Sequence, residues 1–298
     1  MNVRRMTSER PVDLARTLFP LRRGTGDPTM RIGSGEAWRA TRTPEGPATV
    51  HVSVDGAGLR AEAWGTGAVW ALDHAPSFVG LTDDDSQFQP HHGVIADLFR
   101  RLRAVRITRT ERPTEALIPA VLEQKVTGVE ARRAYRRLAS ALSEPAPGPA
   151  GLLMPPDPAG VAALPYHAFH PFGVARSRAE TLRFVCARAS AIDALTELPP
   201  LDARAHLTRF PGIGGWTAAE VARLSLGDAD AVSVGDFHLP NLVTWALAGE
   251  ARGTDRRMLE LLEPYLGHRG RVQVLLEAGG VRAPRFGPRM DVPAIERI

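Results

Sequence analysis

Residues 210–236 read FPGIGGWTAAEVARLSLGDADAVSVGD, and this stretch governs how the rest of the chain is interpreted. Its glycines at 212, 214 and 215 predict a tight turn where another molecule can approach the backbone closely. Apolar residues recur at helical spacing from Trp216 onward, so a helix is expected to begin there. Asp236 stands twenty residues after Trp216, just beyond the apolar run 231–234.

Two interpretations of this pattern are open. In the first, backbone N–H groups at the start of the helix bind a phosphate, and the Asp236 carboxylate supplies chemistry beside a bound nucleic acid. In the second, the glycines form an ordinary turn before a core helix, and Asp236 caps the helix that follows at Phe237. We favour the first because the arrangement of all 27 residues, rather than one pair of glycines, matches a known pattern.

That pattern resembles the hairpin and catalytic region of the helix-hairpin-helix DNA glycosylase superfamily. Within it, the chain is most similar to the 3-methyladenine DNA glycosylase II (alkylbase glycosylase) branch. The resemblance is strong over 110–136 and 165–247 and weaker at the N-terminus. It implies an α+β protein with a small N-terminal α/β-sheet domain, placed at 1–88, followed by an all-α helix-hairpin-helix domain at 89–298.

Local patterns along the chain agree with this division. Residues 1–10 are expected to form a loose polar tail, and the acidic stretch 82–86 a linker. A Pro-rich stretch, 143–158, is expected to be an exposed loop within the helical part, and the basic tail 282–289 to be irregular. Strand-like patterns lie at 37–43, 49–54 and 59–64, and helical spacing at 11–19, 69–72, 93–105, 114–125, 128–142, 178–195 and 216–226.

Composition excludes several classes of protein. The net charge of +4 is compatible with a polyanionic partner without requiring one. The single cysteine, Cys186, rules out an intrachain disulfide and a cysteine-ligated cluster, and so excludes the iron–sulfur branch of the superfamily. The sequence shows neither a membrane-spanning run nor a secretory signal. We therefore expect a monomer in the cytoplasm, at the bacterial nucleoid.

Asp236 is the candidate catalytic residue. Cleavage of an N-glycosidic bond creates an oxocarbenium-like sugar, which a nearby carboxylate stabilises. Asp228 and Asp230 are rivals by composition, but the resemblance assigns the role to Asp236, and we interpret the other two as turn and capping residues. His238 is expected at the mouth of the same site.

Trp216 follows the hairpin directly and decides the subclass. In bifunctional members of the superfamily a lysine stands here and attacks the sugar, whereas tryptophan cannot form a Schiff base. The resemblance therefore implies a monofunctional glycosylase in which Trp216 lines the base pocket and stacks on a cationic alkylated base. The alternative is a core aromatic at the start of a helix.

Residues 124–127, Gln-Lys-Val-Thr, resemble the family loop that enters the DNA minor groove. Relatives place a bulky apolar wedge beside the glutamine, whereas this chain has Lys125, its only lysine. The lysine stem can fill the gap and its ammonium can reach a phosphate; a solvated lysine and a lyase amine are alternatives. The residues expected to contact DNA are Gln124, Lys125, Val126, Thr127, Gly212, Ile213, Gly214, Gly215, Thr217, His268, Arg269 and Arg271.

Two further expectations concern what the site lacks. Alkylbase relatives often supply a second pocket aromatic from the last long helix, but here 270–276 carries none, so His268, Arg269 and Arg271 are expected to meet phosphates or to form a solvated basic face. The histidines show no metal spacing, so we expect no catalytic metal and no cofactor. By resemblance, a monovalent cation is expected at the hairpin carbonyls of Arg209, Gly212 and Gly214.

Two functions from different classes follow. The first is a monofunctional DNA glycosylase that flips alkylated or deaminated purines out of damaged double-stranded DNA and hydrolyses the N-glycosidic bond. The second is a protein of the same fold that binds branched or damaged DNA with little or no excision. Asp236 and Trp216 favour the first, and Lys125 and the missing aromatic favour the second. A third reading, a helical interaction protein without nucleic acid, conflicts with the hairpin.

Overall fold

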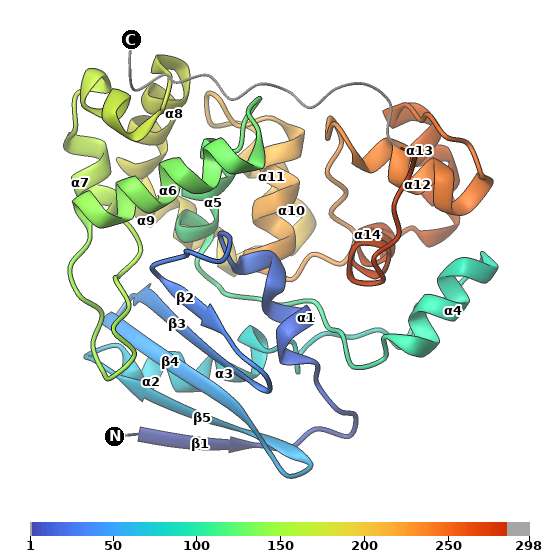
Figure 1. Cartoon of the computed structure of the whole chain (residues 1–298), viewed down its shortest axis with the longest axis horizontal. Coiled ribbons are helices and arrows are strands. Elements are labelled where there is room, and N and C mark those ends of the chain that lie inside the picture. The colour runs from blue at the N-terminus through green and yellow to red at the C-terminus, as the bar shows by residue number, and fades with distance from the viewer. Residues whose placement is uncertain (1, 285–298) are drawn as a thin grey trace.

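The computed structural model describes residues 2–284, and the chain is an α+β protein, as the sequence predicts (Figure 1). The strands that the structure describes form one antiparallel sheet in the order β1-β5-β4-β3-β2. Most of the predicted tail, 282–289, lies outside the described residues. The strands are β1 (Asn2–Met6), β2 (Met30–Ile32), β3 (Glu36–Thr43), β4 (Gly46–Asp55) and β5 (Gly58–Trp64).

The hairpin predicted at 49–64 is present. β4 and β5 pair in antiparallel register, with Val54 opposite Leu59 and Asp55 opposite Gly58. Burial alternates along β5, so one face of the sheet joins a core that α2 covers. This alternation is what a strand with one buried face requires.

The N-terminal segment corrects one prediction. Residues 1–10 were expected to form a loose tail, but β1 (Asn2–Met6) is a strand at the edge of the sheet and pairs antiparallel with β5, Arg4 opposite Ala61. Its sequence lacks the alternation that marks a strand, because an edge strand takes its order from the neighbour to which it hydrogen-bonds. The tail begins only after Met6.

Helices follow the sheet, and most lie where the sequence predicts them. The helix predicted at 128–142 has those bounds because a Thr127–Glu130 capping box fixes its start. The helix predicted at 178–195 is broken near Ala187 into two. The α-helices are α1 (Leu14–Leu18), α2 (Ala68–Asp73), α3 (Ala75–Phe78), α4 (Gly93–Arg101), α5 (Pro113–Leu122), α6 (Gly128–Leu142), α7 (Pro158–Ala163), α8 (Arg176–Cys186), α9 (Ala189–Asp193), α10 (Pro200–Leu207), α11 (Gly215–Val221), α12 (Leu239–Ala248), α13 (Asp255–Leu262) and α14 (Arg269–Ala278).

The Pro-rich stretch corrects a second prediction. Although 143–158 is irregular for most of its length, it is not simply exposed, since Ala150, Leu152 and Met154 are buried against Ala40 of the sheet. The backbone N–H of Leu153 also donates to the carbonyl of Pro28 at 2.9 Å. This stretch therefore ties the helical part back to the sheet.

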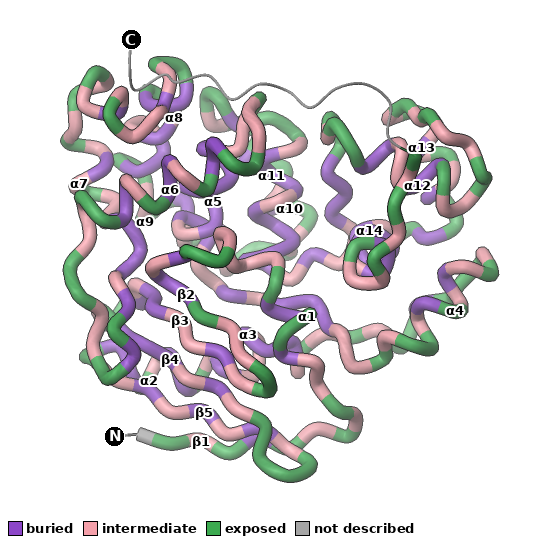
Figure 2. Tube along the Cα trace, viewed as in Figure 1, coloured by how far each residue is buried: buried purple, intermediate pink, exposed green. Residues whose placement is uncertain are grey.

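The helical part contains two hydrophobic clusters, visible as two groups of buried segments in Figure 2. One is built from buried residues of 116–231, between α5 and the segment after α11. The other joins α4 to α12, α13 and α14. The stretch that decided the sequence interpretation runs from the first cluster into the second, so Asp236 lies where the chain passes between them.

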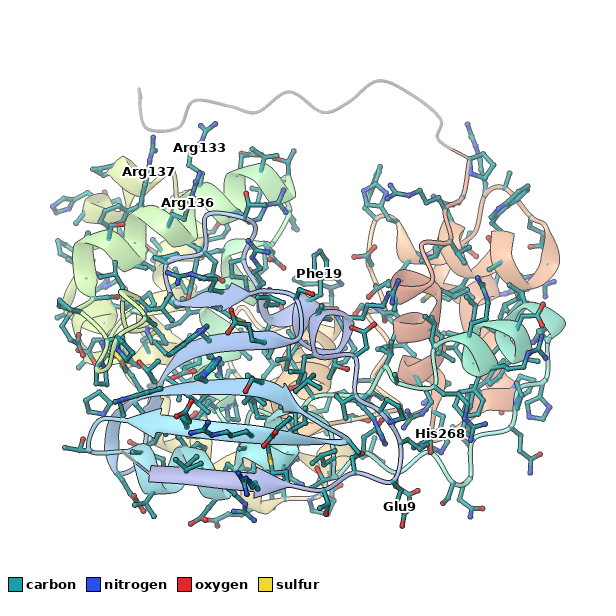
Figure 3. The ribbon with its side chains drawn as sticks, turned by 60° about the horizontal axis from the view of Figure 1, so that its bottom comes forward. Glu9, Phe19, Arg133, Arg136, Arg137 and His268 are labelled. Atoms are coloured by element: carbon teal, nitrogen blue, oxygen red, sulfur yellow. The ribbon has the colours of Figure 1, made fainter. Side chains whose placement is uncertain are left out.

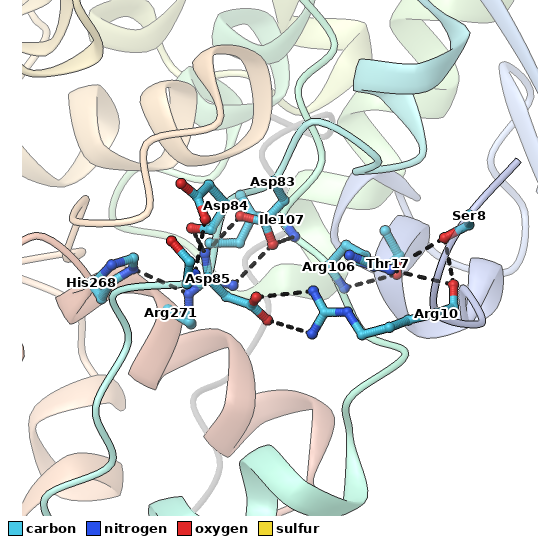
Figure 4. A network of polar contacts seen from close by, with 11 residues as sticks. Ser8, Arg10, Thr17, Asp83, Asp84, Asp85, Arg106, Ile107, His268 and Arg271 are labelled. Atoms are coloured by element: carbon cyan, nitrogen blue, oxygen red, sulfur yellow. Dashed lines mark hydrogen bonds and ion pairs between the residues drawn. The ribbon is translucent and has the colours of Figure 1, made fainter. Parts of the chain in front are cut away.

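A polar network also connects distant segments (Figure 4). The predicted acidic linker 82–86 lies at its centre, with Asp85 bound to Arg10 by two hydrogen bonds of 2.9 Å and Asp83 bound to Arg271 of α14. Arg106 donates to the backbone carbonyl of Arg10 at 3.4 Å. The linker thus holds the N-terminal segment and the last helix together through ion pairs.

Within residues 2–284, the structure contains no helix that is both long and apolar enough to cross a membrane.

Candidate functional site

The glycine turn joins α10 to α11 and has the geometry of a hairpin between two helices. Gly212 has a φ of +83°, a conformation that favours glycine, and a Cβ there would clash with the Thr181 side chain. Added Cβ atoms at Gly214 and Gly215 would instead meet open space. Ile213 is only 4% exposed and anchors the turn in the core. The backbone of Gly214 and Gly215 is therefore the accessible part of the hairpin.

The start of α11 presents backbone N–H groups at this surface. The first hydrogen bond of the helix runs from the N–H of Ala218 to the carbonyl of Gly214 at 3.0 Å. The N–H groups of Gly214, Gly215 and Trp216 precede it, so they have no partner within the helix. Such groups bind anions well.

Asp236 is held from two sides. Its Oδ2 accepts a 3.1 Å hydrogen bond from the indole nitrogen of Trp216, and its Oδ1 accepts the backbone N–H groups of His238 and Leu239 at 2.7 and 2.8 Å. Both interpretations of the sequence are thus realised, because Asp236 caps the start of α12 and also faces Trp216. Asp236 is partly exposed, so its carboxylate is rigidly positioned and still accessible.

Trp216 is only partly buried, and its bond to Asp236 gives the ring a polar partner. His238 and its neighbour Phe237 are exposed, and their rings meet edge to face with centroids 4.9 Å apart. These aromatic side chains and the carboxylate lie within three residues of one another along the chain or are bonded directly. The predicted catalytic and pocket residues are therefore brought together.

Gln124 connects the predicted minor-groove loop to the hairpin. Its Nε2 donates to the carbonyl of Gly212 and to the hydroxyl of Thr217, both at 2.9 Å. Thr217 is 2% exposed, so its side chain braces the loop from inside rather than facing a partner. The two predicted DNA-binding segments, 88 residues apart for Gln124 and Gly212, form one surface.

Lys125 lies at the tip of this loop. It is exposed and has a φ of +54°, one of the two positive values found at non-glycine residues in the described chain. Such backbone strain concentrates at functional sites. Val126 is partly buried, and Thr127 is committed to capping α6, its hydroxyl bonded to Glu130. Lys125 is therefore the side chain that projects farthest from the loop toward solvent.

The C-terminal basic residues are placed differently from one another. Arg271 is 4% exposed and binds Asp83 at 2.7 and 2.9 Å, so its guanidinium points into the network of Figure 4. Arg269 binds Asp230 through its side chain, and His268 lies beside Arg271. The structure does not bring Arg271 to the hairpin surface, and we leave it out of the proposed interface.

The rival carboxylates have structural contacts. Asp230 also accepts the backbone N–H groups of Gly267 and Arg269, at the start of α14. Asp228 is 6% exposed and lies 3.0 Å from Arg204; burial raises the pKa of its carboxyl despite this partner. Both serve as turn and capping groups, which is how the sequence was interpreted.

Two groups of residues escaped the sequence interpretation. Phe19 is 68% exposed and stands out from the 3-10 turn after α1 (Figure 3). A set of carboxyl groups, Glu123, Glu220 and Glu277, surrounds Arg223 behind Asp236. Neither set has a sequence motif, since exposure of one aromatic and convergence of distant glutamates become visible only in three dimensions.

The described residues contain no group of three or more His, Cys, Asp or Glu placed to hold a metal ion. Of the hairpin carbonyls, that of Gly212 accepts the Gln124 amide and that of Gly214 accepts the N–H of Ala218. A carbonyl has a second lone pair, so these bonds are compatible with a monovalent cation. The cation site at Arg209, Gly212 and Gly214 stays a prediction.

No protein-family model matches the chain, and no curated protein matches its sequence. Solved structures do match it, and they are DNA glycosylases of the helix-hairpin-helix type. The chain has the fold of these enzymes, which confirms the resemblance found in the sequence at the level of fold.

Three of these structures can be named. The 3-methyladenine DNA glycosylase from Archaeoglobus fulgidus is 16% identical, with 93% of this chain and 96% of that one covered and a TM-score of 0.76. The Clostridium acetobutylicum 8-oxoguanine glycosylase/lyase, in complex with double-stranded DNA, is 13% identical, with 90% and 91% covered and a TM-score of 0.68. The Schizosaccharomyces pombe 3-methyladenine DNA glycosylase, with abasic DNA, is 17% identical, with 66% and 94% covered and a TM-score of 0.52. At these identities the likeness concerns the fold, so the chemistry must be argued from this chain's own residues.

Proposed function

We propose that this protein is a monofunctional DNA glycosylase that flips an alkylated or deaminated purine out of double-stranded DNA and hydrolyses its N-glycosidic bond. The observation that carries the proposal is the position of Asp236, an accessible carboxylate fixed by Trp216 and by the first N–H groups of α12. The neighbouring hairpin offers unpaired backbone N–H groups to a DNA phosphate.

Asp236 stabilises positive charge on the deoxyribose as the bond to the base breaks. A preorganised carboxylate next to a developing cation is worth most where water is excluded. Its two oxygens are already oriented by three hydrogen bonds, so little reorganisation is needed during the reaction. Water then attacks the sugar, and an intact abasic site remains.

The absence of lyase chemistry follows from the nature of the residue at 216. Trp216 has no amine, and the only lysine of the chain, Lys125, lies on the loop that Gln124 ties to the hairpin. In this proposal Lys125 enters the minor groove and partly fills the space that the flipped base leaves. Trp216 stacks on the extruded base, and Phe19 is a candidate for a further contact.

Single-turnover excision from duplexes containing 7-methylguanine, 3-methyladenine or hypoxanthine tests the proposal. We expect the wild type to release at least one base and Asp236→Asn to release none. Asparagine caps helices as well as aspartate does, so this variant keeps the start of α12 and removes only the charge. Asp202→Asn, at an exposed position of α10, is the matched control. Release of no base by the wild type, or equal release by both proteins, contradicts the proposal.

A second function is favoured by Lys125 in place of an apolar wedge. A protein of this fold that recognises branched or damaged DNA would need the hairpin and the loop but not the charge of Asp236. It should bind four-way junctions more tightly than linear duplex, and Asp236→Asn should bind as the wild type does. Equal affinity for junction and duplex removes the reason for this alternative.

A further inference from the structure

A group of ionisable side chains lies behind the site on three elements of the fold. Arg223, which is 5% exposed, is bonded to Glu220 at 2.8 Å and lies 3.9 Å from Glu277 of α14. Glu123, at the end of α5, is close enough to Glu220 and Arg223 to feel both charges. Three carboxyl groups thus share one arginine, an arrangement that a purely structural ion pair does not need.

The group also contains unpaired buried polar atoms. Gln273 of α14 is 3% exposed, and its Nε2 donates to Glu277 at 2.9 Å, so the amide faces the group. Its Oε1 and the Nε of Arg223 are buried without a hydrogen-bond partner among the described residues. Buried polar atoms are nearly always paired in native proteins, so these atoms point to water or a ligand as the missing partner.

Glu277 lies in a recess that solvent reaches. Burial, followed by the charge of Arg223 acting in the opposite sense, leaves the pKa of its carboxyl raised, yet 42% of the side chain is accessible to water. A group can be both desolvated and accessible when it lines a hollow. Of the partners, Glu123 is 27% accessible and Glu220 14%, so the recess deepens from Glu277 toward Arg223.

This recess adjoins the candidate catalytic group. The hydroxyl of Ser233 donates to Glu220, and the carbonyl of Ser233 accepts the backbone N–H of Asp236 at 3.1 Å. The charge of Asp236 is also among those that act on Glu277. The loop that positions Asp236 is therefore one wall of the recess, and α14 is the opposite wall.

We propose that Glu277, supported by Glu220 and Gln273, forms an acidic wall of the base pocket that selects cationic, amino-bearing purines over neutral deaminated ones. This inference rests on the proposed function, which leaves alkylated and deaminated purines as equal candidates. It assigns the specificity of the site to a carboxylate at the position along the last helix where relatives were expected to supply an aromatic.

The chemistry of the two base classes explains the selection. A carboxylate accepts hydrogen bonds and donates none. The Watson–Crick edge of 7-methylguanine offers it a ring N–H and an amino group side by side, on a ring that is positively charged. Hypoxanthine is neutral and has no amino group, and its carbonyl oxygen would face the carboxylate. A cationic guest would also offset the mutual repulsion of Glu220 and Glu277.

Binding and excision measured in parallel test the inference. Duplexes containing 2′-fluoro analogues of 7-methylguanosine and inosine, which resist cleavage, report binding by fluorescence anisotropy, while the ordinary nucleotides report single-turnover excision. We expect the wild type to prefer 7-methylguanine in both assays. Glu277→Gln should reduce that preference by about tenfold or more, as the loss of a charge-assisted hydrogen bond implies.

Glutamine at 277 can still accept the Gln273 amide, so the variant is expected to fold, and a thermal melt verifies this. Glu197→Gln, at an exposed position, is the control and should keep the wild-type preference. Equal loss for both bases, or no change in preference, overturns the inference while leaving the glycosylase proposal intact. Preferential binding of the 7-methylguanine duplex without any excision would instead sustain the acidic pocket and overturn the glycosylase proposal.

Discussion

The indole nitrogen of Trp216 and the carboxylate of Asp236 are joined by a 3.1 Å hydrogen bond, although twenty residues separate them in the chain. This bond couples the ring at the start of α11 to the carboxylate at the start of α12. A tryptophan that merely filled the core would not need an accessible carboxylate as its partner. The orientation of the ring and the position of the charge are therefore set together.

Replacing Trp216 with phenylalanine keeps an aromatic ring and removes this bond. A hydrogen bond to a charged group contributes about 1.5 to 3 kcal/mol, so we expect single-turnover excision to slow by roughly tenfold or more. The thermal midpoint should change little, because the ring is only partly buried. Trp245→Phe, at a position 38% exposed, is the control. An unchanged rate for Trp216→Phe would show that the bond does not position the carboxylate for the reaction.

The hairpin glycines are expected to separate DNA binding from stability. Gly214→Ala and Gly215→Ala place a methyl group in open space, so the free energy of unfolding should stay unchanged or rise by up to about 1 kcal/mol. Affinity for duplex DNA should fall because the methyl group occupies the approach of the phosphate. Gly212→Ala should instead destabilise the fold by about 1 to 2 kcal/mol or more, given its positive φ and the Thr181 side chain. DNA affinity that survives both exposed substitutions would remove the hairpin from the interface.

Lys125 combines a strained backbone with an exposed cation. Lys125→Gly should stabilise the folded protein by about 1 kcal/mol by relieving the φ of +54°. Lys125→Ala should weaken binding to damaged duplex and reduce the salt dependence of binding by about one unit of slope, without abolishing non-specific association. Borohydride should trap no covalent complex with either protein. A covalent complex that requires Lys125 would reveal a lyase and contradict the monofunctional assignment.

Local signals explain which parts of the fold the sequence predicts well. The helix at 128–142 has a capping box at Thr127, and the β4–β5 hairpin has alternating burial around a Gly turn. The glycines at 212–215 likewise carry their geometry in their own chemistry. The site hypothesis at Trp216 and Asp236 succeeds in bringing the two residues together because both belong to this one continuous stretch.

Non-local packing explains what the sequence could not predict. β1 is ordered only by its pairing with β5, and the Pro-rich stretch 143–158 is buried only because the sheet lies beneath it. The recess around Arg223 draws on residues as far apart as Glu123 and Glu277, and no window of sequence contains both. In each case the determining partner lies far away along the chain.

Arg271 illustrates the same point and gives a prediction. Both it and Asp83 have side chains 5% accessible, so Arg271→Met leaves a buried carboxylate without its partner. Removing one member of a buried pair typically costs about 3 to 5 kcal/mol, which urea denaturation would measure. The Asp83→Asn, Arg271→Met double variant should recover part of this loss. Because Arg271 lies away from the hairpin surface, the salt dependence of DNA binding should be unchanged; a shallower slope would restore it as a phosphate contact.

His74 gives the stability of the protein a specific pH dependence. Its Nε2 lies 3.1 Å from Oε2 of Glu111, and its ring stacks on Trp70 with centroids 3.7 Å apart. The hydrogen bond with Glu111 is the main reason why the pKa of His74 is raised, since it outweighs the effect of burial. The imidazolium therefore contributes stability below its unfolded-state pKa of about 6.5, and this contribution is lost as the pH rises through the higher pKa of the folded state.

Denaturation of the wild type and of His74→Gln isolates this contribution. The difference in the free energy of unfolding between the two proteins should be larger near pH 6 than near pH 9, where the wild-type imidazole is neutral on the basis of its pKa of about 6.5 in unfolded chains. Comparing the two proteins at each pH cancels the other groups that titrate in this range. His167→Gln, at an exposed position, should show no such dependence. A difference that stays constant with pH, or grows toward pH 9, would mean that Glu111 holds a neutral imidazole and that packing on Trp70, rather than charge, explains the contribution of His74.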